Sequence, residues 1–266
     1  MPLVLIRGAG EMASGTAHRL LAAGYRVIMT ELLQPLAVRR GVSFAQAVFT
    51  GSTRVEGVEA VHANSIPEAL TLTSQGKIPV LTREIDSGTL ASLQVAALVD
   101  ARLAKVNLGT KMDEARVVIG LGPGFTAGVD VHAVIETNRG HDLGRVLYSG
   151  SAMANTGNPG DIGGYRQERV LKSTAAGVFS SNLQIGDLLA PGDVFGCLEG
   201  NPIHAPIRGI VRGLLMTGTW VNAGTKLGDI DPRGIREYCF TISDKARAIA
   251  GGVLEALLHL GGGVAP

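Results

Sequence analysis

The sequence predicts an α/β protein with an N-terminal Rossmann-like parallel sheet, a C-terminal duplicated β barrel-sandwich-like domain and a terminal helix. Three observations support this fold class. Short apolar runs alternate with helical segments in the N-terminal third, a pattern typical of a parallel sheet covered by helices on both faces. A glycine-rich turn follows the first apolar run. Two similar glycine-rich stretches follow one another near the C-terminus, which indicates an internal duplication.

The predicted domains follow the same order along the chain. We expect a Rossmann-like nucleotide-binding domain over 1–110 and a glycine-rich middle segment of strands and loops over 111–168. The duplicated domain then covers 169–236, and a C-terminal strand and helix cover 237–266. Apolar runs predict strands at 3–6, 25–30, 55–61, 78–81 and 96–100. Helices are predicted at 17–23, 42–49 and 67–74.

Composition excludes several classes of protein. The 266 residues carry 24 Lys and Arg against 23 Asp and Glu, a formal charge of +1, whereas nucleic-acid binders usually have a basic excess. Two cysteines, Cys197 and Cys239, do not make a disulfide framework. No apolar stretch approaches the ~18 residues of a membrane span, and Met1–Arg7 has no features of a signal peptide. We therefore expect a cytoplasmic protein with neither nucleic acid nor membrane as partner.

The glycine turn after the first strand predicts a ligand site. Gly8 allows a tight turn, Gly10 lets a phosphate approach the backbone, and the following helix offers free N–H groups. Glu31 ends the next strand, at the spacing of an acid that binds ribose hydroxyls. The third glycine of the usual pattern is displaced, so the ligand could be a nucleotide, another anion, or none. The predicted cofactor-binding residues are Gly8, Gly10, Glu11, Met12, Gly15 and Glu31.

The middle segment supplies further polar candidates. Alternation places Asp130, His132, Val134 and Glu136 on one face of a strand. An imidazole between two carboxylates could bind a metal or move protons, but a half-exposed strand explains the pattern equally, so no metal ligand is assigned. The catalytic candidates are His132 and Lys111. Other residues expected to face the ligand are Gly122, Gly124, Glu136, Arg139, His141, Asn155 and Thr156. The loop 155–164 is either functional or a linker.

The internal repeat relates residues 171–200 to 203–232 at an offset of 32. Each copy predicts short strands broken by glycine turns, and one copy alone cannot bury its apolar face. The second copy resembles the biotinyl/lipoyl carrier domains, but the joint Glu199-Gly200-Asn201-Pro202 has no lysine for a swinging arm. We therefore expect a docking or structural module. Ser243 is the predicted N-cap of a helix over 246–260, and the tail from Gly261 is expected to be loose.

Several longer motifs carry a resemblance to a known family. They are Arg7-Gly8-Ala9-Gly10-Glu11-Met12-Ala13-Ser14-Gly15, the run from Gly120 to His141, Asn155-Thr156-Gly157, Gly228-Asp229-Ile230-Asp231-Pro232-Arg233 and Ser243-Asp244-Lys245-Ala246. Together they resemble the YqeB-type proteins of the selenium-dependent molybdenum hydroxylase system. The N-terminal part is also similar to the Rossmann domain of XdhC accessory proteins, which help to insert sulfurated molybdenum cofactor. The resemblance implies an accessory role in maturation of a molybdenum hydroxylase, with that enzyme as partner.

The leading function is therefore a maturation factor that binds a nucleotide or a molybdopterin-type cofactor. Three alternatives stay open. One is an NAD(P)-dependent oxidoreductase with His132 or Lys111 as acid or base. A second is a sulfur- or selenium-transfer enzyme using Cys197 or Cys239, although buried structural thiols are the simpler interpretation of both. The third is a non-catalytic docking scaffold. A homo-oligomer is compatible with each.

Overall fold

The computed structural model describes residues 1–261, and the chain divides into two units. Unit 1 contains Met1–Leu33, Phe44–Thr156 and the chain from Ile242 onward. Unit 2 contains Gln34–Ser43 and Gly157–Thr241. Both units are therefore discontinuous in sequence. Apart from Gly261, the tail predicted to be loose lies outside the described residues.

Unit 1 is built on one mixed sheet of nine strands, in the order β10-β9-β7-β6-β1-β2-β5-β4-β3. The central strands are parallel, and Leu5 of β1 pairs with Ile28 of β2 and Leu98 of β6. At the edges, β3 runs antiparallel to β4, and β10 antiparallel to β9. The strands are β1 (Leu3–Arg7), β2 (Arg26–Thr30), β3 (Ser52–Val55), β4 (Val58–Ala63), β5 (Ile78–Leu81), β6 (Ala97–Asp100), β7 (Val117–Leu121), β9 (Ala133–Ile135) and β10 (Val146–Leu147). A separate pair joins β8 (Thr126–Ala127) to β11 (Gly150–Ser151).

The predicted fold class is wrong. A Rossmann-like parallel sheet was expected, whereas the nine-stranded sheet is mixed, and separate four-stranded antiparallel sheets replace the expected barrel-sandwich-like domain. Apolar periodicity identifies strands but does not fix their direction. The run predicted as one strand over 55–61 shows why. Glu56 and Gly57 have φ of 43° and 87° and reverse the chain into the β3–β4 hairpin.

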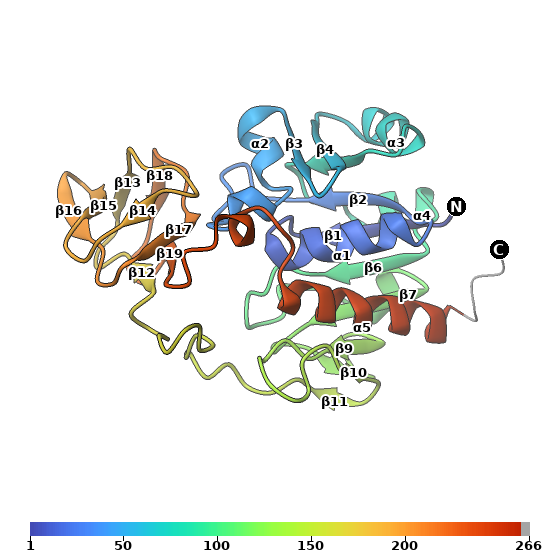
Figure 1. Ribbon diagram of the computed structural model, residues 1–266. Coiled ribbons are helices and arrows are strands. Elements are labelled where there is room, and N and C mark those ends of the chain that lie inside the picture. Colours follow the sequence, from blue (N-terminus) through green and yellow to red (C-terminus); the bar gives the residue numbers. More distant parts are fainter. Residues whose placement is uncertain (262–266) are drawn as a thin grey trace. The chain divides into compact units, whose positions relative to one another are not determined.

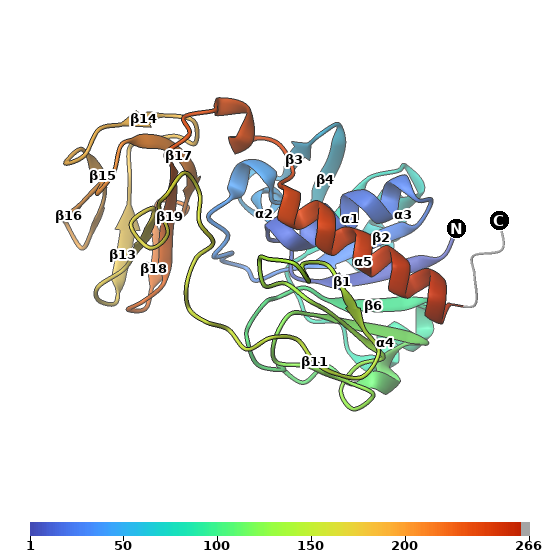
Figure 2. The same ribbon diagram turned by 60° about the horizontal axis from the view of Figure 1, so that its bottom comes forward.

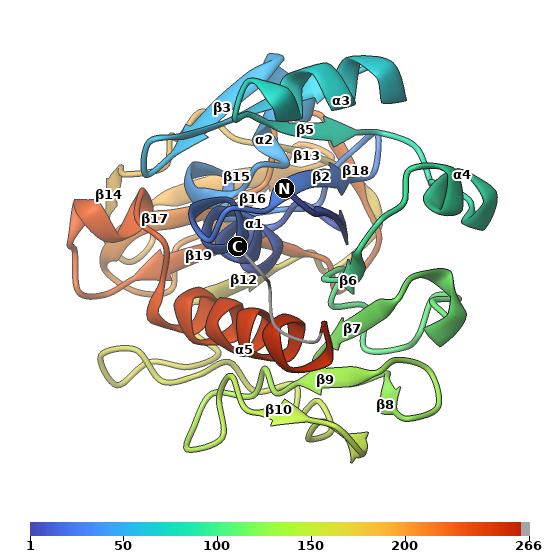
Figure 3. The ribbon, with the colours of Figure 1, turned by 90° about the vertical axis from the view of Figure 1, so that its right-hand side faces the viewer.

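Helices cover both faces of the sheet in unit 1. They are α1 (Glu11–Ala22), α2 (Gln46–Thr50), α3 (Ile66–Ser74), α4 (Ser87–Ser92) and α5 (Asp244–Leu260). Leu3 and Leu5 of β1 share a core with Ala69 of α3 and Leu90 of α4. On the opposite face, α1 and α5 lie side by side, with α5 over β7, β9 and β10 (Figure 1; Figure 3). None of the helices in residues 1–261 is long and apolar enough to span a membrane.

Unit 2 contains two four-stranded antiparallel sheets, β12-β19-β17-β14 and β16-β15-β13-β18 (Figure 2). Their strands are β12 (Val170–Lys172), β13 (Gly177–Ser180), β14 (Leu188–Leu189), β15 (Val194–Leu198), β16 (Asn201–His204), β17 (Gly209–Leu214), β18 (Thr219–Val221) and β19 (Lys226–Asp231). The offset of 32 relates β12 to β16, β13 to β17, β14 to β18 and β15 to β19. Each sheet therefore takes two strands from each copy of the repeat. Phe179, Phe195 and Leu227 lie in the shared core.

The segment Gln34–Ser43 belongs to unit 2, although it follows β2 of unit 1 in the sequence. Val38 is buried in the core of unit 2, and its carbonyl accepts from the Leu214 N–H at 2.7 Å. The helix predicted over 42–49 is thus two elements, a 3-10 helix at Arg40–Val42 and α2. Two further 3-10 helices lie at Met112–Glu114 and Arg236–Cys239.

Candidate functional site

The glycine turn between β1 and α1 lies at the carboxyl edge of the parallel strands. Gly8 has φ of +94°, a left-handed value that favours glycine. A Cβ at Gly8 would lie 3.1 Å from the Ala101 carbonyl oxygen, so the turn packs against the chain that leaves β6. Gly10 is the N-cap of α1 and contributes no capping side chain. A Cβ at Gly10 would meet no atom within 4 Å, so the space on that side of Gly10 is open.

Glu31, at the end of β2, supports this turn. Its Oε2 accepts a hydrogen bond from the Ala9 N–H at 2.8 Å, and its Oε1 accepts from the Leu32 N–H at 2.8 Å. Desolvation raises the pKa of Glu31, and the two N–H donors oppose that shift. The carboxylate therefore fixes the backbone of the turn. Its contact with a ribose stays a prediction.

The other predicted cofactor residues belong to α1. Glu11 lies in the first turn, and Met12 is buried in the core. A Cβ at Gly15 would lie 2.9 Å from the Ala246 Cβ, which is closer than two such atoms pack. Gly15 therefore allows α1 to approach the first turn of α5, and through this contact α5 reaches the glycine turn.

A network of paired charges holds the loop that follows β6. We call Arg7, Asp100, Arg102, Thr110 and Glu114 the arginine network. Arg7 donates to both oxygens of Glu114 at 2.9 and 2.6 Å and to Thr110 Oγ1 at 2.7 Å. Thr110 and Arg102 both donate to Asp100. The side chains of Arg7 and Glu114 are each 8% exposed. The network fixes residues 101–114 across the carboxyl edge of the sheet.

Lys105 lies on this fixed loop. Its backbone has φ of 68°, which is unusual for a residue other than glycine. A Cβ at Gly124 would lie 2.8 Å from the Val106 nitrogen, so the loop rests directly on the turn that follows β7. Lys105 is exposed, and partial desolvation by neighbouring protein atoms lowers the pKa of its ammonium. Gly124 itself is required by this packing, because a side chain there would collide with the backbone of Val106.

The start of α5 brings a second lysine to the same edge. Ser243 caps the helix by accepting from the Ala246 N–H at 3.3 Å, which confirms the predicted N-cap. Arg139, in the loop after β9, donates to the two oxygens of Asp244 at 2.5 and 3.0 Å. The neighbouring Lys245 is half-buried. The loop after β9 and the first turn of α5 are therefore held together.

We call Lys105 and Lys245 the ammonium pair, because the charge of Lys105 contributes to the lowered pKa of Lys245. Desolvation, and then repulsion from Lys105 and Arg139, lower the pKa of Lys245, while Glu11 and Glu136 act in the opposite direction. Neither Nζ atom has a hydrogen-bond or ion-pair partner among residues 1–261. The first turn of α5, which carries Lys245, packs against α1 at Gly15. Such an arrangement can bind an anion.

Glu136 and Gly122 lie at the same edge of the sheet, directly after β9 and β7 respectively. The Glu136 side chain is buried, and its oxygens accept from the Asn138 N–H at 2.6 Å and the Met153 N–H at 2.8 Å. A Cβ at Gly122 would collide with Thr137 Oγ1. Both residues therefore stabilise the loops around the ammonium pair.

His132 lies at the other edge of the sheet. It precedes β9, and its Nδ1 accepts from the Val118 N–H at 3.0 Å, near the amino end of β7. Desolvation lowers its pKa. Asp130 accepts from the Thr126 N–H and closes a local turn. The predicted polar strand face is therefore wrong. Strand β9 contains only the three buried residues Ala133–Ile135. Asp130 and His132 precede it, and their side chains accept hydrogen bonds from nearby backbone N–H groups.

The remaining candidates occupy exposed loops. Lys111 follows Thr110, and its backbone N–H donates to Glu114 Oε2 at 2.8 Å. His141 lies in the exposed loop that carries Arg139. Asn155 and Thr156 are exposed at the end of the middle segment of unit 1. Their predicted ligand contacts stay predictions.

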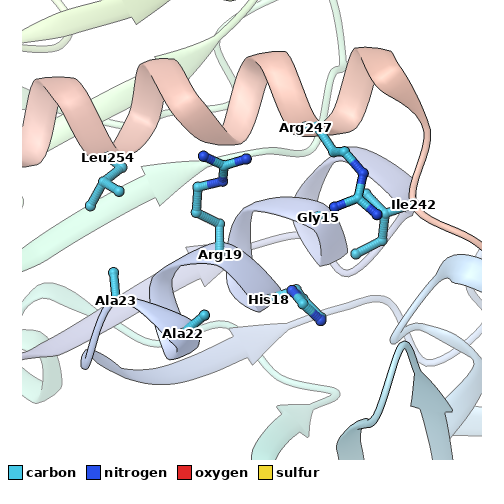
Figure 4. Close-up of a pocket in the computed structure, with 8 residues that line it drawn as sticks. All are labelled: Gly15, His18, Arg19, Ala22, Ala23, Ile242, Arg247 and Leu254. Carbon is cyan, nitrogen blue, oxygen red and sulfur yellow. The ribbon is translucent and has the colours of Figure 1, made fainter.

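A shallow groove runs along the outer side of α1 and α5 (Figure 4). His18, Arg19 and Arg247 line it, and Arg247 donates to both oxygens of Glu56 at 2.8 and 2.9 Å. Neither lysine of the ammonium pair borders this groove. It is a separate surface feature.

The cysteines and the acidic groups suggest no reactive centre. Cys239 is buried beside the Val211 carbonyl, and desolvation raises the pKa of its thiol, which disfavours the thiolate. Cys197 is half-buried in β15. Within residues 1–261, no group of three or more His, Cys, Asp or Glu residues is arranged to hold a metal ion.

Comparison with known proteins identifies a relative in sequence. The chain is 55% identical over 258 residues to "Uncharacterized protein YqeB" of Escherichia coli strain K12. The match covers 97% of this chain and 48% of that protein, so the chain spans about half the length of the curated relative. This finding confirms the resemblance to YqeB, whereas the molybdenum role and the likeness to XdhC stay predictions. No protein-family model matches the chain.

Solved structures show only distant likeness. An aspartoacylase family protein of Mesorhizobium loti is 15% identical with a TM-score of 0.28, over 86% of this chain and 84% of that one. The ectoine utilization protein EutE of Ruegeria pomeroyi is 12% identical with a TM-score of 0.26, over 86% and 85%. A succinylglutamate desuccinylase/aspartoacylase of Rhodobacter sphaeroides is 14% identical with a TM-score of 0.25, over 86% and 84%. At these scores the likeness carries no argument about fold or function.

The sequence interpretation missed Lys105 and Lys245 as site residues. One signal was present for Lys245. A lysine two positions after a serine N-cap stands where the helix dipole disfavours a cation. Lys105 gave no comparable signal, because its position depends on the arginine network and on Gly124, which are distant in sequence.

Proposed function

We propose that unit 1 binds a small molecule through a phosphate group at the carboxyl edge of the nine-stranded sheet. The observation that supports the proposal is the ammonium pair, two lysines for which residues 1–261 provide no hydrogen-bond or ion-pair partner, together with the open space at Gly10. In this proposal the phosphate lies over Gly10, where the space around a Cβ would be open, and contacts Lys105 and Lys245. A phosphate dianion relieves the repulsion between the two lysines and satisfies the N–H groups.

The phosphate is the feature shared by the predicted ligands. Nucleotides, NAD(P) and molybdopterin-type cofactors all present one, and the donor set described here fits that group rather than a metal. The proposed role as an accessory factor in maturation of a molybdenum hydroxylase, selenium-dependent or not, rests on the resemblance to YqeB-type proteins. A hydroxylase is the partner that this role requires.

The oxidoreductase alternative receives less support. His132, one of its two acid–base candidates, lies at the amino end of the sheet strands, and its Nδ1 is engaged by Val118. The ammonium pair lies at the opposite edge. A hydride acceptor bound over Gly10 would therefore be distant from that imidazole.

The proposal is tested by placing a negative charge at the helix start. Gly10 has extended backbone with φ of −68°, and the space around it is open, so Gly10→Asp should fold and cap α1. Gly10→Asn is the matched control, since it has the same shape without the charge. Isothermal titration with pyrophosphate, NAD, NADP and CTP should give binding to wild type that Asp reduces far more than Asn.

The salt dependence provides a second reading of the same experiment. Binding to wild type should weaken as ionic strength rises, because charges in contact with solvent are screened. Equal affinities for the Asp and Asn variants, or no binding of any of these probes to wild type, would contradict the proposed phosphate site.

A further inference from the structure

The groove along α1 and α5 combines nitrogen-bearing side chains with an apolar surface (Figure 4). Its volume is about 370 Å³, whereas sites for small molecules usually measure roughly 300–1,000 Å³. His18, Arg19 and Arg247 supply the nitrogen atoms, and Leu254 and Ala22 belong to the apolar surface. Among the described residues, no Asp or Glu lines the groove. The groove therefore suits a ligand that is anionic at one end and apolar at the other.

Arg247, at one end of the groove, already has its charge compensated. Its guanidinium donates to both oxygens of Glu56, at 2.8 and 2.9 Å. The same carboxylate accepts from the Ile242 N–H at 2.9 Å. Glu56 lies in the turn between β3 and β4, so these contacts fix that turn against the start of α5. Arg247 thus shapes the groove and adds little net charge to it.

His18, on α1, faces the same turn. Its Nε2 lies 3.4 Å from the Glu56 carbonyl oxygen. Because a carbonyl oxygen can only accept, that ring nitrogen is the donor. The imidazole is counted as neutral at pH 7. His18 therefore contributes a fixed polar wall to the groove, but not a second full charge.

Arg19 is the cation in the groove whose charge is not compensated. Its side chain is half-buried and has no hydrogen-bond or ion-pair partner among residues 1–261. The last turn of α1 favours a cation through the helix dipole, which accounts for the charge but not for the direction of the side chain. Figure 4 shows Arg19 extending from α1 toward α5, with Leu254 on one side and Arg247 on the other. The guanidinium is thus directed into the groove.

We infer that this groove binds a small organic monoanion, a carboxylate with a short aliphatic chain. The Arg19 guanidinium receives the carboxylate, since its planar fork matches two carboxylate oxygens. The chain lies on Leu254 and Ala22. One uncompensated cation fits a monoanion, whereas a phosphate dianion would carry a charge that this groove does not neutralise. The inference is independent of the phosphate site proposed at the carboxyl edge of the sheet.

The apolar surface predicts how affinity depends on chain length. Leu254 is half-buried, and Ala22 is exposed with a side chain too small to fill the groove. Burial of one methylene group strengthens binding about fourfold when it is complete. A shallow groove covers one side of the chain, so we expect roughly half of that free energy, or about twofold for each added methylene. Hexanoate should therefore bind at least about tenfold more tightly than acetate.

The test titrates the full chain with hexanoate and follows the backbone amide resonances by NMR. We expect a dissociation constant of about 1 mM or lower, with shifts concentrated at Gly15, His18 and Leu254, which line the groove. Acetate tests the chain, and hexanol and hexylamine test the charge. Both uncharged and cationic analogues should leave these resonances in place at the concentrations where hexanoate saturates them.

Two variants and one control assign the contacts. Arg19→Gln keeps a long polar side chain without the charge, and should weaken hexanoate binding at least about tenfold. Arg54→Gln, on the exposed strand β3 outside the groove, is the matched control and should bind as wild type does. Ala22→Phe fills the apolar part of the groove from an exposed position, and should weaken hexanoate much more than acetate. Thermal melts confirm that each variant is folded.

Each of the other outcomes overturns a defined part of the inference. Equal hexanoate affinity in wild type and Arg19→Gln removes Arg19 from the site, and equal shifts with hexanol remove the anion. Absence of groove shifts at several times the expected dissociation constant overturns the site and leaves the proposed phosphate site untouched. Pyrophosphate that displaces hexanoate overturns the preference for a monoanion, and places phosphate binding in this groove instead of over Gly10.

Discussion

The carboxyl edge of the nine-stranded sheet carries two groups of charged side chains that are built in opposite ways. In the arginine network, Arg7 meets Glu114 through two hydrogen bonds, and Asp100 receives Arg102 and Thr110. In the ammonium pair, Lys105 and Lys245 repel one another and have no partner among residues 1–261. Both groups belong to the same unit, and the network holds the loop on which Lys105 lies.

The difference separates charges that support the fold from charges that, under the proposed function, contact a phosphate. A buried ion pair whose hydrogen bonds are satisfied is tolerated, and removal of one partner is costly. Two like charges crowded together lower stability, and positions of this kind persist where function needs them. The contrast predicts opposite responses of the two groups to the same type of mutation.

The largest expected effect is in the arginine network. Arg7→Met removes the two hydrogen bonds to Glu114 and the one to Thr110 in a buried site, and should lower the free energy of unfolding by about 3 kcal/mol. Urea denaturation followed by circular dichroism measures the loss. Arg54→Met is the control, because Arg54 pairs with Glu59 at an exposed position and should cost at most about 0.5 kcal/mol. Similar losses for the two variants would remove the distinction.

A smaller effect is expected where α1 meets α5. Gly15→Ala places a Cβ 2.9 Å from the Ala246 Cβ, and overpacking of this kind costs about 1–3 kcal/mol. It should also weaken pyrophosphate binding, because it moves Lys245 away from the glycine turn. Gly251→Ala, in α5 with open space around the new Cβ, should instead raise stability by up to about 1 kcal/mol. The idea fails if Gly15→Ala leaves both stability and binding unchanged.

The ammonium pair should give the smallest change in stability and the opposite sign. Lys245→Met relieves a crowded cation and should raise the free energy of unfolding by about 1 kcal/mol, while pyrophosphate binding is lost. Denaturation and titration of the same preparation test both statements. A destabilised variant would show that Lys245 supports the fold, and would place it with the arginine network.

The difference in stability between wild type and Lys245→Met should change with pH in a defined direction. Because the pKa of Lys245 is lowered on folding, the unfolded chain binds more protons between the lowered value and 10.5. Wild-type stability therefore gains from this group as pH rises through that range, and the advantage of Lys245→Met should shrink. Denaturation of both proteins between neutral pH and pH 10.5 checks it. A constant difference would contradict the assigned shift.

The sequence predicted local features more reliably than the architecture. The strand at 78–81, the helix at 67–74 and the cap at Ser243 depend on neighbours in sequence, and the structure has all three within a residue. The assignment of Gln34–Ser43 to unit 2 depends on distant partners, and the direction of β3 depends on the turn at Glu56 and Gly57, which lies inside an apolar run. Alternation of polar and apolar residues did not reveal either.

The candidate site shows the same division. Gly8 and Glu31 were recognisable because the turn and its acid lie in one short segment. Lys105 and Lys245 were missed because the packing around them depends on Gly124, Gly15 and the arginine network, which are far apart in the chain. His132 attracted attention as an imidazole among acids, yet its ring nitrogen is used by a neighbouring strand.

The discontinuity of unit 1 also sets the order in which the protein is assembled. Helix α5 follows the long segment Gly157–Thr241 of unit 2 in the sequence, but it packs on α1 near the beginning of the chain. During synthesis at about 5–20 residues per second, α1 waits on the order of ten seconds for this neighbour to leave the ribosome. Until then the apolar side of β7 and β9 stays uncovered, and Lys245 does not yet exist. The proposed phosphate site is therefore completed late, after unit 2 has had time to fold.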